Sequence, residues 1–204
     1  MALLYRADLT PGKLDHIAAW LPGRPWYGGP ASPSLERVAA CRFDDPAGEV
    51  GVETILVRAE PGGPIFHTPL TYRGTPLDGA DAWLLGTSEH SVLGQRWIYD
   101  AAGDPVYAAV LAAAILTGGT EAAEQISTDD GLMARAPMMS VRGTGSAGTP
   151  VPAVTAVTEV VDDDPTLVTT DGPALALVRV LGGDRPHGPA LLWDEQVLAV
   201  IRDM

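Results

Sequence analysis

Short apolar stretches separated by turn residues make up most of the chain, and this pattern limits the folds that it can adopt. Glycine and proline, 23 and 18 of the 204 residues, interrupt helices and favour turns. Residues 35–43, 50–58 and 65–72 are rich in β-branched and aromatic residues and predict three strands of an antiparallel meander. The middle strand alternates only partly, so we expect both of its faces to be covered. Briefer strand candidates are residues 2–8, 83–85, 90–93 and 96–99.

Two segments carry helix signals instead. Residues 11–21 follow a threonine and begin with a proline, the residue types preferred at a helix start, and their apolar residues recur every three or four positions. Residues 106–117 follow Asp104-Pro105, are mostly alanine, valine, leucine and isoleucine, and end before two glycines. A helix that is apolar nearly all round is usually buried on more than one side. The predicted fold class is α+β, an antiparallel sheet packed on a few helices, followed by a small, mainly antiparallel β unit.

The C-terminal part repeats the pattern of short strands and turns after a segment rich in glycine, threonine and proline. That segment, residues 143–152, predicts a hinge or linker. Two domains are therefore predicted, an α+β domain over residues 1–125 and a small β subdomain over residues 126–204. The four or five strands expected in the second domain are residues 154–161, 166–169, 174–180, 190–193 and 197–202.

The charge balance argues against two classes of partner. Lysine and arginine number 13 and aspartate and glutamate 26, so the net charge is −13 and the isoelectric point is about 4.5. Such a chain repels phosphate backbones and anionic lipid, and we expect neither a nucleic acid nor a membrane as partner. The single cysteine, Cys41, excludes an internal disulfide framework, and no apolar run approaches the ~20 residues of a membrane span. We therefore expect a cytoplasmic protein.

One glycine-rich motif raises the question of phosphate binding. Residues 143–148 spell G-x-G-x-x-G, the spacing of dinucleotide-binding turns. Such a turn opens a helix, whereas prolines follow this one at positions 150 and 152, so the sequence favours a flexible connection. Phosphoryl transfer generally uses a lysine or an arginine on the phosphates, and the only lysine, Lys13, lies far from the motif in sequence. We expect no cofactor.

No other arrangement of residues predicts catalysis or a metal site. The four histidines lie in separate segments without the spacing of metal ligands, so we expect no metal and no catalytic residue. Glu49 and Glu53 would share a strand face at about 13 Å, which exceeds the carboxylate separations of glycosidases. An uncharacterised enzyme would instead need dispersed carboxylates, for example Glu53, Glu89 and Asp100, to converge in one cleft.

Aromatic side chains provide the candidate binding surface. Most of the large rings lie in the first half of the chain, and two of them belong to the ordered Gly- and Pro-rich loop over residues 24–30. Such rings either fasten loops to a small sheet or form a platform for a sugar or a protein partner. The candidate binding residues are Arg24, Trp26, Tyr27, Tyr72, Trp97 and Tyr99.

Several of these segments resemble the N-terminal cap domain of the actinobacterial maltokinases, which phosphorylate maltose in the trehalose-to-glucan pathway. Residues 24–29, Arg-Pro-Trp-Tyr-Gly-Gly, are similar to a motif after the first cap helix. Residues 56–72, with Pro69-Leu70, resemble a strand pair of the cap, and residues 94–107 resemble the lead into its closing helix. The resemblance covers about residues 1–120. Small standalone proteins with such a cap, some labelled 1,4-α-glucan branching protein, are the implied relatives.

The resemblance extends to residues 165–181, which look like the opening hairpin of the β subdomain that follows the cap, the start of a kinase N-lobe. Ala176 stands where that subdomain would hold a nucleotide-binding lysine, and no catalytic lobe follows before Met204. We therefore expect a non-catalytic cap-like protein of glucan or trehalose metabolism that associates with another protein or with itself. The alternative is a binding module for α-glucan or maltose that uses the aromatic residues of the cap.

Overall fold

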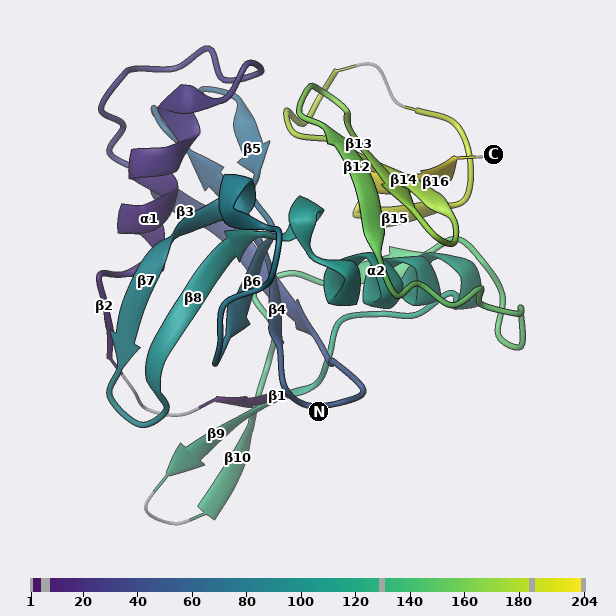
Figure 1. Ribbon diagram of the computed structural model, residues 1–204, viewed down its shortest axis with the longest axis horizontal. Coiled ribbons are helices and arrows are strands. Elements are labelled where there is room, and N and C mark those ends of the chain that lie inside the picture. Colours follow the sequence, from purple (N-terminus) through teal and green to yellow (C-terminus); the bar gives the residue numbers. More distant parts are fainter. Residues whose placement is uncertain (1, 5–7, 129–130, 184–185, 203–204) are drawn as a thin grey trace.

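The computed structural model describes residues 2–4, 8–128, 131–183 and 186–202. Strands dominate it, and α1 (Lys13–Trp20) and α2 (Pro105–Thr117) are the α-helices of these residues. Two large sheets, here called the N-terminal and the C-terminal sheet, are antiparallel throughout their described strand pairs. The N-terminal sheet curls beside α1, and α2 lies below the C-terminal sheet (Figure 1). The predicted α+β class is confirmed.

The N-terminal sheet has seven strands in the order β2-β7-β8-β6-β4-β3, with β5 paired to β4. As expected, both faces of β4 are covered, because Val52 and Leu56 pack around α2 whereas Ile55 and Val57 pack with Ile17 of α1. The strands are β2 (Leu9–Thr10), β3 (Glu36–Phe43), β4 (Gly51–Arg58), β5 (Ile65–His67), β6 (Leu70–Arg73), β7 (Leu84–His90) and β8 (Gly94–Asp100).

Two strand predictions in this sheet need correction. The strand expected over residues 65–72 is divided into β5 and β6, because Pro69 has no N–H to donate to a ladder. The strand expected over residues 90–93 is wrong. His90 ends β7, its ring nitrogen accepts the N–H groups of Val92 and Leu93, and the chain turns there into β8.

Helix α1 begins two residues later than predicted. Thr10, expected as its cap, lies in β2 and pairs with Glu89 of β7. Gly12 is the N-cap instead, and its N–H donates to the Asp15 carboxylate at 2.8 Å. The single turn η1 (Leu21–Gly23), which contains Pro22 and Gly23, follows the helix.

Helix α2 is at the centre of the main core, as its apolar composition predicts. Asp104 caps it by accepting the N–H of Val106 at 2.9 Å, and Gly118 ends it in the left-handed conformation, with φ 71°. Around α2, one continuous cluster includes Leu56 of the N-terminal sheet and Leu177 of the C-terminal sheet. The two large sheets thus share a hydrophobic core, and the division into two domains stays a prediction.

The C-terminal sheet has the order β11-β15-β16-β14-β13-β12. All five predicted strands are present in it, and β11 is an additional edge strand that was not predicted. Its strands are β11 (Val141–Gly143), β12 (Val157–Val161), β13 (Thr166–Thr170), β14 (Ala174–Leu177), β15 (Ala190–Trp193) and β16 (Gln196–Arg202).

A third, small sheet combines the start of the chain with a hairpin from its middle. Strand β1 (Ala2–Leu4) is parallel to β9 (Glu124–Thr128), which pairs in turn with β10 (Gly131–Arg135). Residues 5–7 of the strand predicted over residues 2–8 lie outside the described residues. Neither α1 nor α2 is long and apolar enough to cross a membrane.

Candidate functional site

The residues predicted as a binding surface occupy different parts of the N-terminal sheet. Three of them follow η1, and the two rings among these three lie near Phe66 of β5, whereas the other three residues belong to β6 and β8. Side chains alternate between the two faces of a strand, so the second group is divided as well. Tyr72 lies on the face covered by α1, whereas Trp97 and Tyr99 lie on the opposite face. The first group is Arg24, Trp26 and Tyr27, and the second is Tyr72, Trp97 and Tyr99.

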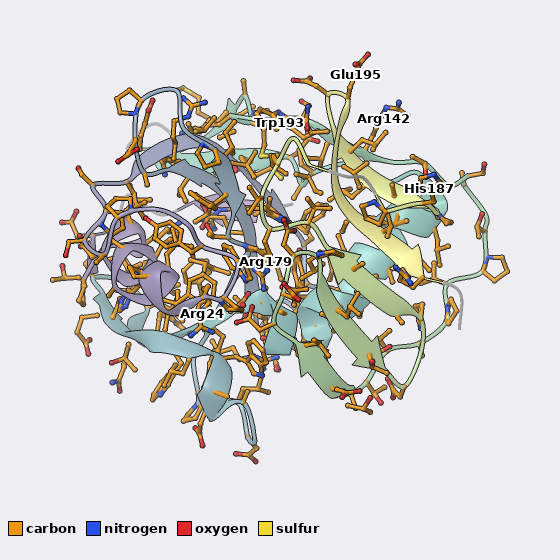
Figure 2. All side chains as sticks on the ribbon, turned by 90° about the horizontal axis from the view of Figure 1, so that it is seen from above. Arg24, Arg142, Arg179, His187, Trp193 and Glu195 are labelled. Carbon is orange, nitrogen blue, oxygen red and sulfur yellow. The ribbon has the colours of Figure 1, made fainter. Side chains whose placement is uncertain are left out.

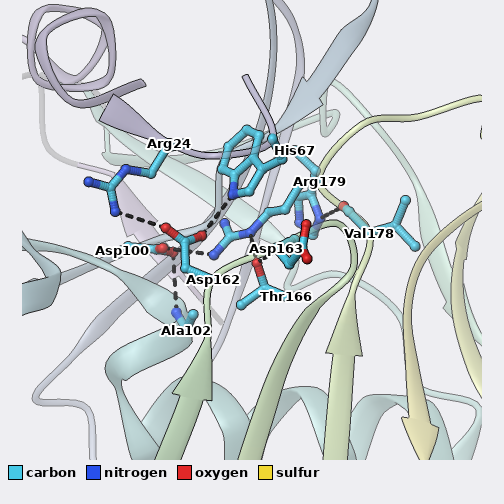
Figure 3. A network of polar contacts seen from close by, with 10 residues as sticks. Arg24, His67, Asp100, Ala102, Asp162, Asp163, Thr166, Val178 and Arg179 are labelled. Atoms are coloured by element: carbon cyan, nitrogen blue, oxygen red, sulfur yellow. Dashed lines mark hydrogen bonds and ion pairs between the residues drawn. The ribbon is translucent and has the colours of Figure 1, made fainter. Parts of the chain in front are cut away.

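Arg24 and Trp26 bind an aspartate of the C-terminal sheet. The Arg24 guanidinium donates to one carboxylate oxygen of Asp162 at 3.0 Å, and the Trp26 indole N–H donates to the other at 2.7 Å (Figure 3). Asp162 follows β12, so these bonds join the loop after η1 to the turn between β12 and β13. Both side chains are therefore engaged in a contact between two parts of the same chain.

Arg179 extends this contact into the interior. Its guanidinium donates to Asp100 at 2.7 Å and to the Thr166 hydroxyl at 2.7 Å, and it lies 5.3 Å from the centre of a Trp26 ring. Arg179 is 0% exposed and Asp100 is 1% exposed. Figure 2 shows Arg179 in the middle of the molecule, between the two large sheets. We call Arg24, Trp26, Asp100, Asp162, Thr166 and Arg179 the inter-sheet network.

The backbone joins the two large sheets at the same place. The His67 N–H donates to the Arg179 carbonyl at 2.8 Å, and the Leu181 N–H donates to the Ile65 carbonyl at 2.9 Å. Nδ1 of His67 lies 3.0 Å from the Val178 carbonyl, which can only accept, so this nitrogen carries the proton of a neutral ring. Burial, and then the charge of Arg179, lower the pKa of His67 to about 3.

Tyr72 belongs to a charged cluster beside α1, which we call the Glu53 cluster. The Tyr72 hydroxyl donates to the Glu53 carboxylate at 2.8 Å, and the ammonium of Lys13 donates to the same oxygen. Burial opposes the ionisation of Glu53, but Lys13 and Arg42 outweigh it and hold its pKa below the ordinary value. Burial and the Glu53 charge raise the pKa of Tyr72. The only lysine of the chain is therefore held in an internal ion pair.

The remaining predicted rings differ in exposure. Tyr27 packs on Phe66 at 5.0 Å between ring centres, and its hydroxyl donates to the Pro30 carbonyl at 3.1 Å. The buried Tyr99 accepts the N–H of Leu77 at 2.9 Å. These two rings fasten loops to the sheet, whereas Trp97 is half-buried at the surface of β8.

The carboxylates considered for an enzyme are engaged separately. Glu53 pairs with Lys13, Asp100 pairs with the buried Arg179, and Glu89 is exposed on β7. Among the residues that the structure describes, no group of three or more histidine, cysteine, aspartate or glutamate side chains could hold a metal ion. The arrangement supplies ion pairs that fix the fold.

The glycine-rich motif packs against the end of α2. The N–H of Gly145 donates to the Ile115 carbonyl at 2.9 Å, and the N–H of Ser146 donates to the Leu116 carbonyl at 3.0 Å. These carbonyls belong to the last turn of the helix, its negative end, whereas phosphates bind at the positive end. The prediction of a flexible linker is therefore wrong over this motif, and so is the alternative of a phosphate-binding turn.

Glycine is required in the motif because the two segments approach closely. A Cβ atom on Gly143 would lie 1.9 Å from the Ala114 carbonyl oxygen, and one on Gly145 would lie 1.9 Å from that of Leu116. The Thr144 N–H also donates to the Ala190 carbonyl of β15, at 2.9 Å. The motif thus connects the end of α2 to the C-terminal sheet.

A cleft lies between the two large sheets, and none of the predicted binding residues lines it. Its volume is about 390 Å³, and it runs between residues 155–160 along β12 and residues 77–83 of the N-terminal part. Trp83 forms part of its wall and packs directly on Gly103. No local sequence signal marks this site, because its walls are more than 70 residues apart in the sequence.

A known family matches most of the N-terminal sheet. Residues 20–104 match the family model of the maltokinase N-terminal cap domain. Over these residues the chain is cap-like. The match runs from the end of α1 to the N-cap of α2 and includes β3 to β8, so the resemblance seen in the sequence is confirmed there. The matched residues make up less than half of the chain. The comparison with curated proteins found no match.

Proposed function

We propose that this protein is a non-catalytic, cap-like protein of glucan or trehalose metabolism that acts by associating with another protein. The proposal is supported by two observations together: residues 20–104 are cap-like, and the candidate phosphate-binding groups make contacts inside the fold. Lys13 is paired with Glu53, and the glycine-rich motif is bonded to α2. A cap whose lysine and neighbouring glycine-rich motif are engaged inside the fold is suited to positioning a partner.

The absence of phosphotransfer is tested by incubating the purified protein with ATP, Mg²⁺ and a panel of sugars that includes maltose. We expect no phosphorylated sugar above a reaction without protein. Formation of a sugar phosphate that scales with protein concentration would overturn the non-catalytic assignment.

The association is tested by co-purification from a native lysate followed by reconstitution with the recombinant candidate. We expect a stoichiometric complex with a protein of glucan or trehalose metabolism. The variant Asp100→Asn, which disturbs the inter-sheet network, shows whether binding needs the intact arrangement of the sheets. Recovery of no stoichiometric partner across growth conditions would contradict the proposal.

Binding of α-glucan or maltose is the second candidate, favoured by the partial exposure of Trp97 at the surface of β8; Tyr27 and Tyr72 are also half-buried, but their hydroxyls are bonded inside the protein. Trp97 is half-buried, whereas Trp26 and Tyr99 are buried in internal contacts. Titration calorimetry with maltose, maltodextrin and glycogen tests this function, with Trp97→Ala as the variant and Tyr27→Phe as the control. If wild type and Trp97→Ala bind these sugars with equal affinity, Trp97 is not the ring on which the sugar stacks.

A further inference from the structure

The strand β12 leaves one edge of the C-terminal sheet unpaired. It is the end strand in the order β11-β15-β16-β14-β13-β12, and β13 pairs with one side of it. Within the described chain, no strand pairs with the other side. An antiparallel end strand directs about half of its N–H and C=O groups away from its neighbour, where they can pair with an added strand.

The cleft follows this free edge. Residues 155–160 form one wall, and four of them, 157–160, belong to β12, whereas the segment from Leu77 to Trp83 contributes the facing wall. Six residues of an extended peptide span about 20 Å, at roughly 3.3 Å per residue. The volume of about 390 Å³ is within the range of sites that enclose small ligands, and the groove is bounded along its length by a strand edge. This shape suits an extended chain.

The groove combines apolar walls with negative charge. Leu77, Trp83 and Val157 are half-buried and contribute apolar surface, whereas Asp78 and Glu159 are exposed on facing walls. The residues that line the cleft include no lysine, arginine or histidine. The whole chain carries a net charge of −13, which adds to the attraction for a basic segment.

We propose that β12 is a docking edge to which an extended, basic segment of a protein partner adds as a further strand, with its side chains alternating between the apolar wall and the two carboxylates. Main-chain hydrogen bonds supply affinity in this mode of recognition, and alternate side chains supply specificity. The inference rests on the proposed function, because it assigns the surface through which the association occurs.

Charge argues against a second copy of the chain as the occupant. If two β12 strands paired about a two-fold axis near their centres, Glu159 of each copy would approach Glu159 of the other. Like charges directly opposite each other in a sheet are destabilising. A basic strand places opposite charges at the same positions.

The test uses three capped six-residue peptides. One alternates lysine and valine, one replaces each lysine by glutamate, and one is the lysine peptide with N-methyl groups on alternate amides. Binding is measured by fluorescence anisotropy of labelled peptides and by NMR shifts of the amides of residues 155–160. We expect the lysine peptide to bind about tenfold more tightly than the glutamate peptide, and N-methylation to remove binding because it removes the donors.

Two variants locate the binding edge. Glu159→Lys should lower the affinity for the lysine peptide by about tenfold. Glu36→Lys is the matched control, because Glu36 is an exposed glutamate on β3, the end strand of the other large sheet. The affinity of this control variant for the lysine peptide should stay within about twofold of wild type. Equal affinities for the lysine and glutamate peptides, or equal effects of the two variants, would overturn the proposal.

Other outcomes identify other occupants and also overturn the proposal. A dimer in sedimentation with protected β12 amides would assign the edge to a second copy. If maltose or maltodextrin shifts the NMR signals of Trp83 and β12 and no peptide binds, the cleft would be assigned to a carbohydrate. If a stoichiometric protein partner binds Glu159→Lys as well as wild type, the docking edge is wrong while the proposed association stands.

Discussion

Arg179 of the C-terminal half and Asp100 of β8 form an ion pair in the centre of the protein, with the guanidinium and carboxylate 2.7 Å apart and both side chains almost completely buried. Thr166 accepts a second guanidinium hydrogen bond, and the N–H of Ala102 donates to Asp100 at 3.3 Å. A buried charge is tolerated only where such partners replace its hydration. The pair therefore fixes how the cap-like sheet and the C-terminal sheet meet.

Removing one member of this pair should strongly destabilise the protein. We expect Arg179→Met to lower the free energy of unfolding by about 3–5 kcal/mol, because Asp100 is left as an uncompensated buried charge. The double variant Arg179→Met/Asp100→Leu should recover part of the loss. Urea unfolding followed by tryptophan fluorescence measures both. Arg142→Met, at an exposed arginine on β11, is the control, and a loss in Arg179→Met no larger than in that control would contradict the prediction.

The sequence predicted the elements whose signals are local. Asp104-Pro105 and Gly118 define both ends of α2 through capping, and its apolar composition predicts its central burial. The strands β3 and β4 were predicted for the same reason, since the turn residues that separate them lie beside them in the sequence. Capping and turn chemistry act within a few residues, so a single sequence records them.

The site could not be predicted in the same way because its partners are distant in the sequence. Trp26 and Asp162 are 136 residues apart, so nothing near Trp26 indicates that its indole is bonded inside the protein. The prediction for the glycine-rich motif was wrong for a related reason. Gly143 and Gly145 are required because carbonyl groups of α2 lie too close to leave room for a Cβ atom. Spacing alone does not tell whether a glycine admits a phosphate or a neighbouring helix.

Adding one methyl group to the motif should separate it from α2. We expect Gly145→Ala to lower the free energy of unfolding by about 1–3 kcal/mol, because its Cβ would overlap the Leu116 carbonyl and force the backbone to move. Gly183→Ala has open space around the new Cβ and is the matched control. Thermal unfolding and amide exchange at residues 145 and 146 measure the effect. Equal melting temperatures and exchange rates in the two variants would show that the close contact is absent.

The Tyr72 hydroxyl of the Glu53 cluster should contribute measurably to the free energy of unfolding. Tyr72→Phe removes the donor to the Glu53 carboxylate and should cost about 1.5–3 kcal/mol, the range for hydrogen bonds to charged groups. Tyr27→Phe removes a hydroxyl that donates to the neutral Pro30 carbonyl and should cost about 0.5–1.5 kcal/mol. Chemical unfolding of both variants gives the comparison. A smaller loss in Tyr72→Phe than in Tyr27→Phe would show that Glu53 does not rely on this hydroxyl.

His67 should make the protein less stable as the pH falls below about 6.5. The folded-state pKa is about 3, whereas an unfolded histidine titrates near 6.5, so between these values the unfolded state binds a proton that the folded state does not. The contribution to the free energy of unfolding therefore falls by up to about 1.4 kcal/mol per pH unit through this window and is constant above it.

The variant His67→Asn tests this assignment, because its amide N–H₂ can donate to the Val178 carbonyl in place of Nδ1 but does not titrate. Urea unfolding between pH 7.5 and 4.5 should show a shallower decline for this variant than for wild type. The carboxylates contribute equally to the pH dependence of both proteins, so the difference between the two curves gives the contribution of His67. Parallel curves for wild type and His67→Asn would mean that His67 is protonated equally in the folded and unfolded states.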